Sequence, residues 1–193
     1  GKKVDVQLPT KIEPNFIVRD YGTGLSEEDM MGLYTKYGKS TKRGSNNAIG
    51  GFGIGRFAPL SYTESFIVIS VNGDSKTSYS IRVDENDDTV VSRLCSESNS
   101  GEANGIYIQV PTENQHVDNF NLKFKNFSRY IQDNLNVKND SFDYIEPEIS
   151  CDVFDLFEDS SDYYYRASQH AECNNPYILM GGIMYPVNKD DNY

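Results

Sequence analysis

The sequence predicts an α+β fold, in which a mixed, mainly antiparallel sheet carries helices on one face. Short segments in which apolar and polar residues alternate recur along the chain, as in half-buried strands. Two of these segments are separated only by a turn, which is typical of a hairpin. Strands and helices do not alternate strictly, and this order favours an α+β layer over a doubly wound parallel sheet.

The charge distribution predicts where the first domain ends. The chain has 193 residues and a formal net charge of -11. Residues 1–139 hold 17 acidic and 16 basic side chains, whereas residues 140–193 hold 12 acidic and 2 basic ones. We therefore expect a nearly neutral first domain over residues 1–140, and an acidic segment over residues 141–193 that starts a second domain.

Two strands and a helix are expected first. Residues 4–8 alternate in polarity, and residues 16–18 are a short apolar run, so both predict strands. Ser26 with Asp29 three positions later resembles a capping box, and the apolar residues that follow continue a short helix to Tyr34.

An irregular segment and a second helix are expected next. Residues 36–52 show no regular period. From Gly53 to Leu60 the apolar spacing indicates a helix, provided that Pro59 lies in its first turn, where a proline is tolerated.

The middle of the chain predicts more strands. Residues 65–71 and 78–83 flank the turn Asn72-Gly73-Asp74 and form a predicted hairpin. Residues 89–94 and 105–110 are further predicted strands, with a polar loop over residues 96–104 between them.

The last part predicts one helix and one hairpin. Aromatic and aliphatic residues recur at helical spacing over residues 118–135, which indicates an amphipathic helix with a core-facing side. Residues 177–180 and 183–187 flank Gly181-Gly182 and predict a second hairpin.

Composition excludes several function classes. No apolar run approaches the roughly 20 residues that a membrane-spanning helix needs, so we expect no such helix. The acidic balance argues against broad binding of nucleic acid phosphates. The three cysteines form no Cys-x-x-Cys pair and the two histidines are isolated, so we expect no zinc site.

One window has the opposite character, because no acidic residue occurs between Met30 and Thr63. A basic, glycine-rich stretch of this kind suits a small bound polyanion, and the alternative is a solvated loop. Its basic and glycine residues are Lys36, Lys39, Lys42, Arg43, Arg56, Gly32, Gly38, Gly44, Gly50, Gly51, Gly53 and Gly55.

Two common nucleotide motifs fit this window poorly. A Walker A loop would start at Gly32, but five residues instead of four separate Gly32 from Gly38, and no strand precedes them. A dinucleotide fingerprint would start at Gly51, but Arg56 stands where its third glycine belongs.

A pair of motifs fits better. Asp20-x-Gly22-x-Gly24 follows a predicted strand, and residues 50–57 read Gly-Gly-Phe-Gly-Ile-Gly-Arg-Phe at a predicted helix start. Together, with a basic segment between them, they resemble the GHKL (Bergerat-fold) ATPases, which include gyrase B-type topoisomerase subunits, MutL, the ninety-kilodalton heat-shock chaperones and sensor kinases. The resemblance implies a two-layer α/β sandwich that binds ATP with Mg²⁺.

The resemblance also implies roles for individual residues. Asp20 would accept a hydrogen bond from the exocyclic amine of adenine. Gly22 and Gly24 would let the backbone approach the base and ribose, and the second glycine motif would turn backbone N–H groups toward the phosphates. A lid over the nucleotide would lie between the motifs, although its lysines are equally explained as exposed loop charges. The implied phosphate and lid residues are Ser40, Thr41, Lys42, Gly51, Gly53 and Gly55.

A narrower resemblance covers most of the chain. Residues 16–110 and 177–186 are similar to the rIIA lysis-control protein family of T-even-type bacteriophages, in Arg19-Asp20-Tyr-Gly-x-Gly24 and in the flanks of Gly181-Gly182. This resemblance implies action in the cytoplasm of infected bacteria, association with the host membrane, and an rIIB-like phage partner. The GHKL pattern implies a homodimer, and no direct nucleic acid binding is expected from this segment.

The sequence departs from the GHKL pattern in three places, and the third is that the transducer lysine or arginine that contacts the terminal phosphate would lie beyond Tyr193. The family's general-base Glu and Mg²⁺-binding Asn lie on an N-terminal helix, whereas this chain enters a strand soon after Gly1, as a fragment or processed chain would. Ile106 follows Gly105 where topoisomerases and chaperones usually have Thr. Hydrolysis therefore stays open. The competing hypotheses are a topoisomerase- or MutL-like subunit acting on DNA, and a non-hydrolysing interaction module with a degenerate nucleotide pocket.

Overall fold

Two compact units make up the chain in this computed structural model. The first consists of Gly1–Phe120 with Asn136–Asp140, and the second of Asn121–Leu135 with Ser141–Tyr193. The structure describes residues 2–35, 55–98, 100–128, 131–138 and 142–143, and the backbone of residues 163–166, 177–180 and 183–186.

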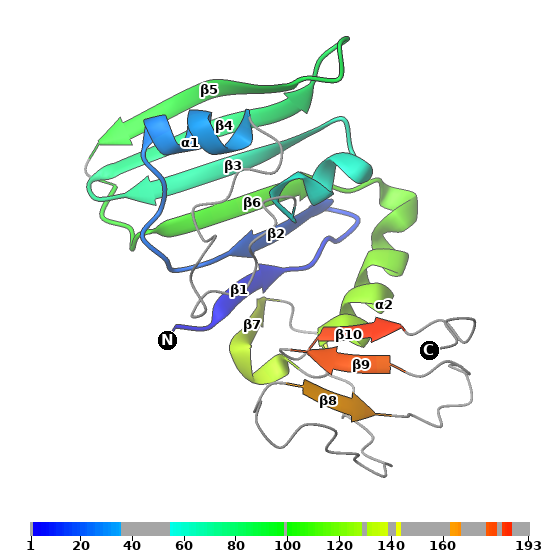
Figure 1. The fold of residues 1–193 in the computed structure, drawn as a ribbon. Helices are drawn as coiled ribbons and strands as arrows, with labels where there is room; N and C mark the ends of the chain where they lie inside the picture. Colours follow the sequence, from blue (N-terminus) through cyan, green and yellow to red (C-terminus); the bar gives the residue numbers. More distant parts are fainter. Residues whose placement is uncertain are drawn as a thin grey trace. The chain divides into compact units, whose positions relative to one another are not determined.

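The first unit is built on a seven-stranded sheet in the order β5-β4-β3-β6-β2-β1-β7 (Figure 1). The ladders that join β1 to β2, β2 to β6, β6 to β3, β3 to β4 and β4 to β5 are antiparallel. The predicted α+β class and mainly antiparallel sheet are thus confirmed. The strands are β1 (Val4–Gln7), β2 (Asn15–Arg19), β3 (Ser65–Asn72), β4 (Ser75–Val83), β5 (Thr89–Ser98), β6 (Gly105–Pro111) and β7 (Leu135–Lys138).

Helix α1 (Glu27–Tyr34) forms where the sequence predicts it. The Ser26 hydroxyl accepts a hydrogen bond from the backbone N–H of Asp29 at 3.1 Å and donates one to the Asp29 carboxylate at 2.7 Å. This reciprocal cap satisfies an N–H group that the first helical turn leaves unpaired. At the other end the Thr35 hydroxyl donates to the carbonyl of Met31.

Helix α1 covers one face of the sheet, across β3, β4 and β5 (Figure 1). Met30 is fully buried there, together with Phe66 and Val68 of β3 and Tyr79 of β4. The buried positions alternate along β3 and β4 with side chains of the other face, as the two-residue repeat of a strand requires. The remaining buried members of this core are Leu33, Tyr34, Phe57, Ile81 and Val110.

The predicted helix from Gly53 forms over its described part, but its type and the place of Pro59 differ from the prediction. Residues Gly55–Ser61 form a 3₁₀-helix, η1, with Pro59 at its fifth position. In an α-helix Pro59 would leave the Gly55 carbonyl without its donor, and its ring would clash with that carbonyl. A tight 3₁₀ segment accommodates the proline. The irregular segment predicted for residues 36–52 lies outside the described residues.

The predicted boundaries are also wrong at β5. It continues to Ser98, although residues 96–104 were expected to form a loop. The hydroxyls of Thr77 and Ser96 lie 2.9 Å apart across β4 and β5, so polar residues pair within this strand without apolar alternation.

The predicted helix over residues 118–135 is too long. Helix α2 (Val117–Ser128) ends earlier, and a 3₁₀ turn, η3 (Gln132–Asn134), leads into β7. Leu135 is buried as the first residue of β7, although its spacing in the sequence also fits the helix. One apolar residue at the end of a periodic run therefore cannot distinguish the two structures.

The second unit contains a three-stranded sheet in the order β10-β9-β8. Strands β9 (Tyr177–Met180) and β10 (Ile183–Pro186) form the predicted hairpin. Strand β8 (Tyr163–Arg166) pairs antiparallel with β9 and was not predicted, because its run of tyrosines shows no alternation. No helix in the described part of the chain is long and apolar enough to cross a membrane.

A buried carboxylate at β1 joins three segments of the first unit. The Asp5 carboxylate accepts hydrogen bonds from the Tyr21 hydroxyl at 2.8 Å and from the Asn136 amide at 3.0 Å, and it pairs with Lys138 at 3.0 Å. Burial alone would raise the pKa of the Asp5 carboxyl, but the bonds from Asn136, Tyr21 and Lys138 outweigh burial and lower that pKa. The charged form of Asp5 therefore holds β7 and the segment after β2 against β1.

We expect Asp5→Asn to lower the free energy of unfolding at pH 7 by about 1–3 kcal/mol, because three donors lose a charged acceptor that is itself buried. The folded-state pKa of Asp5 lies below its unfolded value, so its stabilisation is present above the unfolded pKa and is lost as pH falls through the folded pKa. Urea unfolding at pH 7 and pH 3 measures the free energy of unfolding of the variant and of wild type. The difference between variant and wild type should shrink at pH 3, and a constant difference would contradict the assignment. Asp74→Asn, in an exposed turn, is the control.

Candidate functional site

The candidate site centres on Asp20, directly after β2. Its carboxylate oxygen Oδ1 accepts two backbone hydrogen bonds, from Gly22 N–H at 2.9 Å and from Ile106 N–H at 3.1 Å. The Asp20 N–H donates to the Ile106 carbonyl at 2.9 Å, which continues the β2–β6 ladder by one residue. Within the described residues no hydrogen bond reaches Oδ2, and Asp20 is exposed. The carboxylate is therefore fixed in orientation and presents one acceptor oxygen to a ligand.

Ile106 stands beside Asp20, at the position where the sequence analysis noted a departure from the GHKL pattern. Its backbone N–H fixes Asp20, and its half-buried side chain packs against the core under α1. Ser70 lies opposite Ile106 on β3, but its hydroxyl is bonded to both the N–H and the carbonyl of Leu25. The side chain next to Asp20 at this position of β6 is therefore the apolar one of Ile106.

Glycines allow close backbone approaches around Asp20. Gly24 has φ +72°, and a Cβ there would lie 2.1 Å from the carbonyl oxygen of Val71. Gly105 has φ +148°, and a Cβ there would lie 2.1 Å from the carbonyl oxygen of Asp20. Neither position has room for a side chain. A Cβ at Gly22 would lie 3.3 Å from Asp20 Oδ1, so this glycine is less constrained.

Tyr34 and Arg56 belong to the same region, although the sequence analysis gave Tyr34 no role and named Arg56 only among the basic residues of the acid-free window. The Arg56 guanidinium lies over the rings of Tyr34 at 5.9 Å and Phe57 at 5.0 Å. Burial raises the pKa of Tyr34 to about 12, the Arg56 charge opposes this rise, and the Asp20 carboxylate adds to it. Tyr34 is thus within electrostatic range of both charges. Its phenol stays neutral at physiological pH.

The two ends of the predicted lid are close together. The ring of Tyr34, at the end of α1, meets the ring of Phe57 in η1 edge to face, with centroids 6.2 Å apart. Helix α1 therefore ends, and η1 begins, on the sheet face that carries Tyr34. Gly55 is exposed at the first position of η1. The other predicted phosphate and lid residues lie outside the described residues: Ser40, Thr41, Lys42, Gly51 and Gly53.

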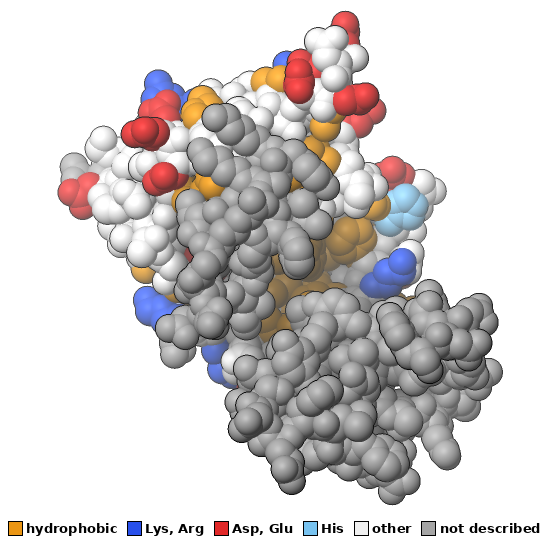
Figure 2. Space-filling model, viewed as in Figure 1, with side chains coloured by type: hydrophobic (Ala, Val, Ile, Leu, Met, Phe, Trp, Pro, Cys, Tyr) orange, Lys and Arg blue, Asp and Glu red, His pale blue; other side chains and the backbone are white. Residues whose placement is uncertain are grey.

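The described residues contain no group of three or more His, Cys, Asp or Glu side chains arranged to hold a metal ion. Figure 2 shows acidic side chains at the tip of the turn between β4 and β5. There the Asp84 carboxylate accepts the backbone N–H groups of Asn86 at 2.9 Å and Asp88 at 3.0 Å. These hydrogen bonds stabilise the turn. They explain the position of the Asp84 carboxylate without a bound cation.

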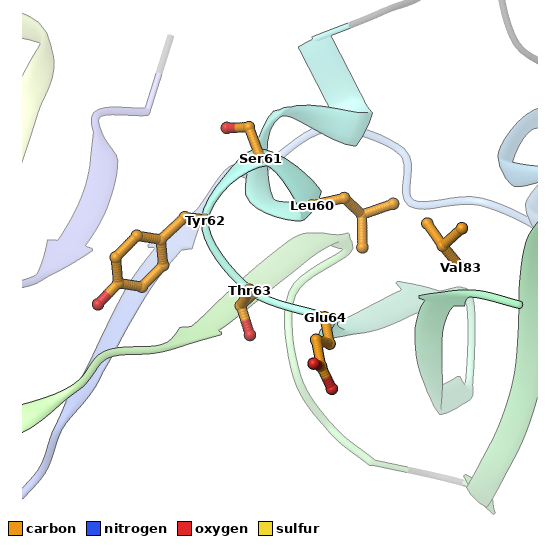
Figure 3. Close-up of a pocket in the computed structure, with 6 residues that line it drawn as sticks. All are labelled: Leu60, Ser61, Tyr62, Thr63, Glu64 and Val83. Carbon is orange, nitrogen blue, oxygen red and sulfur yellow. The ribbon is translucent and has the colours of Figure 1, made fainter. Parts of the chain in front are cut away.

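An open pocket of about 400 Å³ lies at the opposite end of β3 (Figure 3). Leu60 and Val83 point toward each other across it, and Glu64 marks the chain entering β3. About five strand residues, or roughly 17 Å, separate Ser65 from Ser70, which lies opposite Ile106. This pocket is therefore not the Asp20 site. Its lining residues are Leu60, Ser61, Tyr62, Thr63, Glu64 and Val83.

Comparison with protein families assigns the fold around Asp20. A model of the histidine kinase-, DNA gyrase B-, and HSP90-like ATPases matches residues 1–101. The match covers more than half of the chain and includes the Asp20 motif and the second glycine motif. The chain belongs to this family. Proteins of the family generally bind ATP with Mg²⁺, which makes a nucleotide-binding, ATPase-like function the general function of this domain. No curated protein is found to match the chain.

Proposed function

We propose that this chain binds ATP through Asp20 and uses the nucleotide as a conformational ligand. The observation that carries the proposal is the fixed carboxylate. Gly22 and Ile106 hold Oδ1 through their backbone N–H groups, and Oδ2 is left to accept a hydrogen bond. The exocyclic amine of adenine is a donor, whereas guanine carries an acceptor oxygen at the same ring position. A carboxylate at this place therefore favours adenine.

The phosphates would bind where the lid meets the fold. The second glycine motif leads into η1, and the contact between Tyr34 and Phe57 brings the lid ends to the sheet face that Asp20 shares. Backbone N–H groups at Gly51, Gly53 and Gly55 would face the phosphates. The hydroxyls of Ser40 and Thr41 and the ammonium of Lys42 would close over them.

Closure of the lid is the conformational step of this proposal. A ligand that contacts both Asp20 and the lid binds the closed state better than the open one, and it shifts the population by that difference. Dimerisation of closed domains would follow. The described residues do not supply a Mg²⁺ site, so no step of this proposal uses the metal.

We place the switch in an rIIA-like phage protein that acts on lysis in infected bacteria. Support comes from the similarity of residues 16–110 and 177–186 to that family, together with the shared ATPase fold. An rIIB-like partner and peripheral association with the host membrane belong to this proposal. Pull-down of the full chain with an rIIB-like protein, with and without ATP, tests it. Equal capture in both conditions would contradict nucleotide control.

Isothermal calorimetry with a non-hydrolysable ATP analogue tests the binding proposal. We expect one site per chain, with affinity in the micromolar range that is usual for metabolite sites. Absence of heat and of competition by ATP would contradict it. Release of phosphate from ATP, measured in parallel, separates an ATPase from a switch that only binds.

A further inference from the structure

We infer that Glu102, on the opposite face of the sheet from Asp20, is a positioning residue that sets the affinity for the base. This inference rests on the proposed binding of adenine by Asp20. Glu102 itself touches no nucleotide in this account. It acts through the strand residues on either side of the Asp20–Ile106 pair.

The two faces of the sheet are linked at this point. Ile106 packs against the core under α1, and Asp20 is hydrogen-bonded to it directly after β2. Arg19 and Tyr107 are their chain neighbours and are paired with each other across β2 and β6. Successive strand side chains point to opposite faces, so Arg19 and Tyr107 lie behind the candidate site.

Arg19 is held between two aromatic rings. Its guanidinium lies 4.5 Å from the ring centre of Tyr21 and 4.4 Å from that of Tyr107. Its Nη2 donates to the carbonyl of Ala103 at 3.2 Å. Both sequence neighbours of Asp20 therefore belong to one stack, and that stack contacts the segment that leads into β6.

Glu102 provides the charge that holds this stack. Its carboxylate accepts a hydrogen bond from the Tyr107 hydroxyl at 2.5 Å, pairs with Lys76 of β4, and lies 3.8 Å from Nη2 of Arg19. The hydrogen bonds from Lys76 and Tyr107 lower the pKa of Glu102, so it is ionised at neutral pH. The side chains of Glu102, Lys76 and Arg19 are 31%, 26% and 16% exposed, which places this cluster away from full solvent screening.

The link from Glu102 to Asp20 is short. Three residues after Glu102, the backbone of Gly105 passes so close to Asp20 that only a glycine fits. The next residue, Ile106, donates its N–H to Asp20 Oδ1. If the segment before β6 loosens, this N–H moves and the carboxylate loses its fixed orientation. Arg19 also holds this segment through the Ala103 carbonyl, and the charged Glu102 adds its contacts to Tyr107, Lys76 and Arg19.

The test compares Glu102→Gln with Glu97→Gln in the full chain. Glu97 lies opposite Lys76 on β5 and is exposed, so it gives the same change of charge beside one member of the cluster. NMR hydrogen exchange is read at the amides of Gly22 and Ile106, with Val68 in the middle of β3 as reference. We expect Glu102→Gln to speed exchange at Gly22 and Ile106 about tenfold or more, and to leave Val68 and the Glu97→Gln protein unchanged.

Ligand binding provides the second readout. We expect Glu102→Gln to weaken binding of ADP about tenfold but not binding of inorganic tripolyphosphate, because only the base depends on Asp20. Tyr107→Phe, which keeps the ring over Arg19 and removes the hydroxyl, should change ADP binding in the same direction by less.

The possible outcomes separate the inference from the proposed function. Unchanged exchange at Gly22 and Ile106 would overturn the inference, as would faster exchange across the whole sheet or an equal loss of both ligands. If wild-type protein binds no ADP, the proposed function fails, while the exchange rates still decide whether Glu102 positions Asp20.

Discussion

Asp20→Asn should weaken binding of an ATP analogue about a hundredfold and leave the fold intact. Hydrogen bonds to charged groups contribute about 1.5–3 kcal/mol, which corresponds to roughly 10- to 150-fold in affinity. In the variant the amide oxygen can still accept the N–H groups of Gly22 and Ile106. The amide nitrogen then replaces Oδ2 and presents a donor to the donor amine of adenine. Calorimetry of both proteins measures the difference.

The control for this variant is Asp74→Asn, which makes the same chemical change in an exposed turn between β3 and β4. We expect its affinity for the analogue to equal that of wild type. A matching urea midpoint for Asp20→Asn and wild type shows that the fold is retained. Loss of binding in both variants, or in neither, would contradict the assignment of the base to Asp20.

Gly24→Ala should lower the free energy of unfolding by about 2–5 kcal/mol. Two costs add at this position. The backbone adopts a left-handed conformation with φ +72°, which costs an L-residue about 1–2 kcal/mol. The new Cβ would also lie 2.1 Å from the Val71 carbonyl oxygen, so the end of β3 must shift, and overpacking of this kind costs about 1–3 kcal/mol.

Gly73→Ala separates the two costs. Gly73 has a similar φ, +59°, but no atom lies within 4 Å of a Cβ built there. We expect Gly73→Ala to lower the free energy of unfolding only by the conformational cost, about 1–2 kcal/mol. Urea unfolding of both variants measures the difference. Equal losses would mean that the close approach to Val71 relaxes freely and that Gly24 is needed for its conformation alone.

Local patterns account for the parts that the sequence predicts well. The alternation in β1, the turn at Gly73, and the Ser26 cap all depend on residues within a few positions of one another. The two glycine motifs identify the family for the same reason, because each is a short stretch with one backbone task. The family match then confirms this part of the interpretation.

Contacts between residues far apart in the chain account for the features of the fold and the site that the sequence does not predict. The partner of Asp20 is the backbone N–H of Ile106, 86 positions away, and a backbone donor leaves no side-chain signature. The Glu102 cluster joins β2, β4 and β6, so it becomes visible only once the sheet order is known. At β7, pairing in the sheet places Leu135 in a strand, although its spacing in the sequence also fits a helix.

The ratio of affinities for ATP and GTP is the most direct test of the central claim, that the Asp20 carboxylate reads adenine. Non-hydrolysable analogues of the two nucleotides, titrated into wild type and into Asp20→Asn, give this ratio. Wild type should prefer the ATP analogue by tenfold or more, because guanine carries an acceptor oxygen in place of the adenine amine, and the variant should lose that preference. The same ratio in both proteins, or no preference in wild type, would contradict the claim.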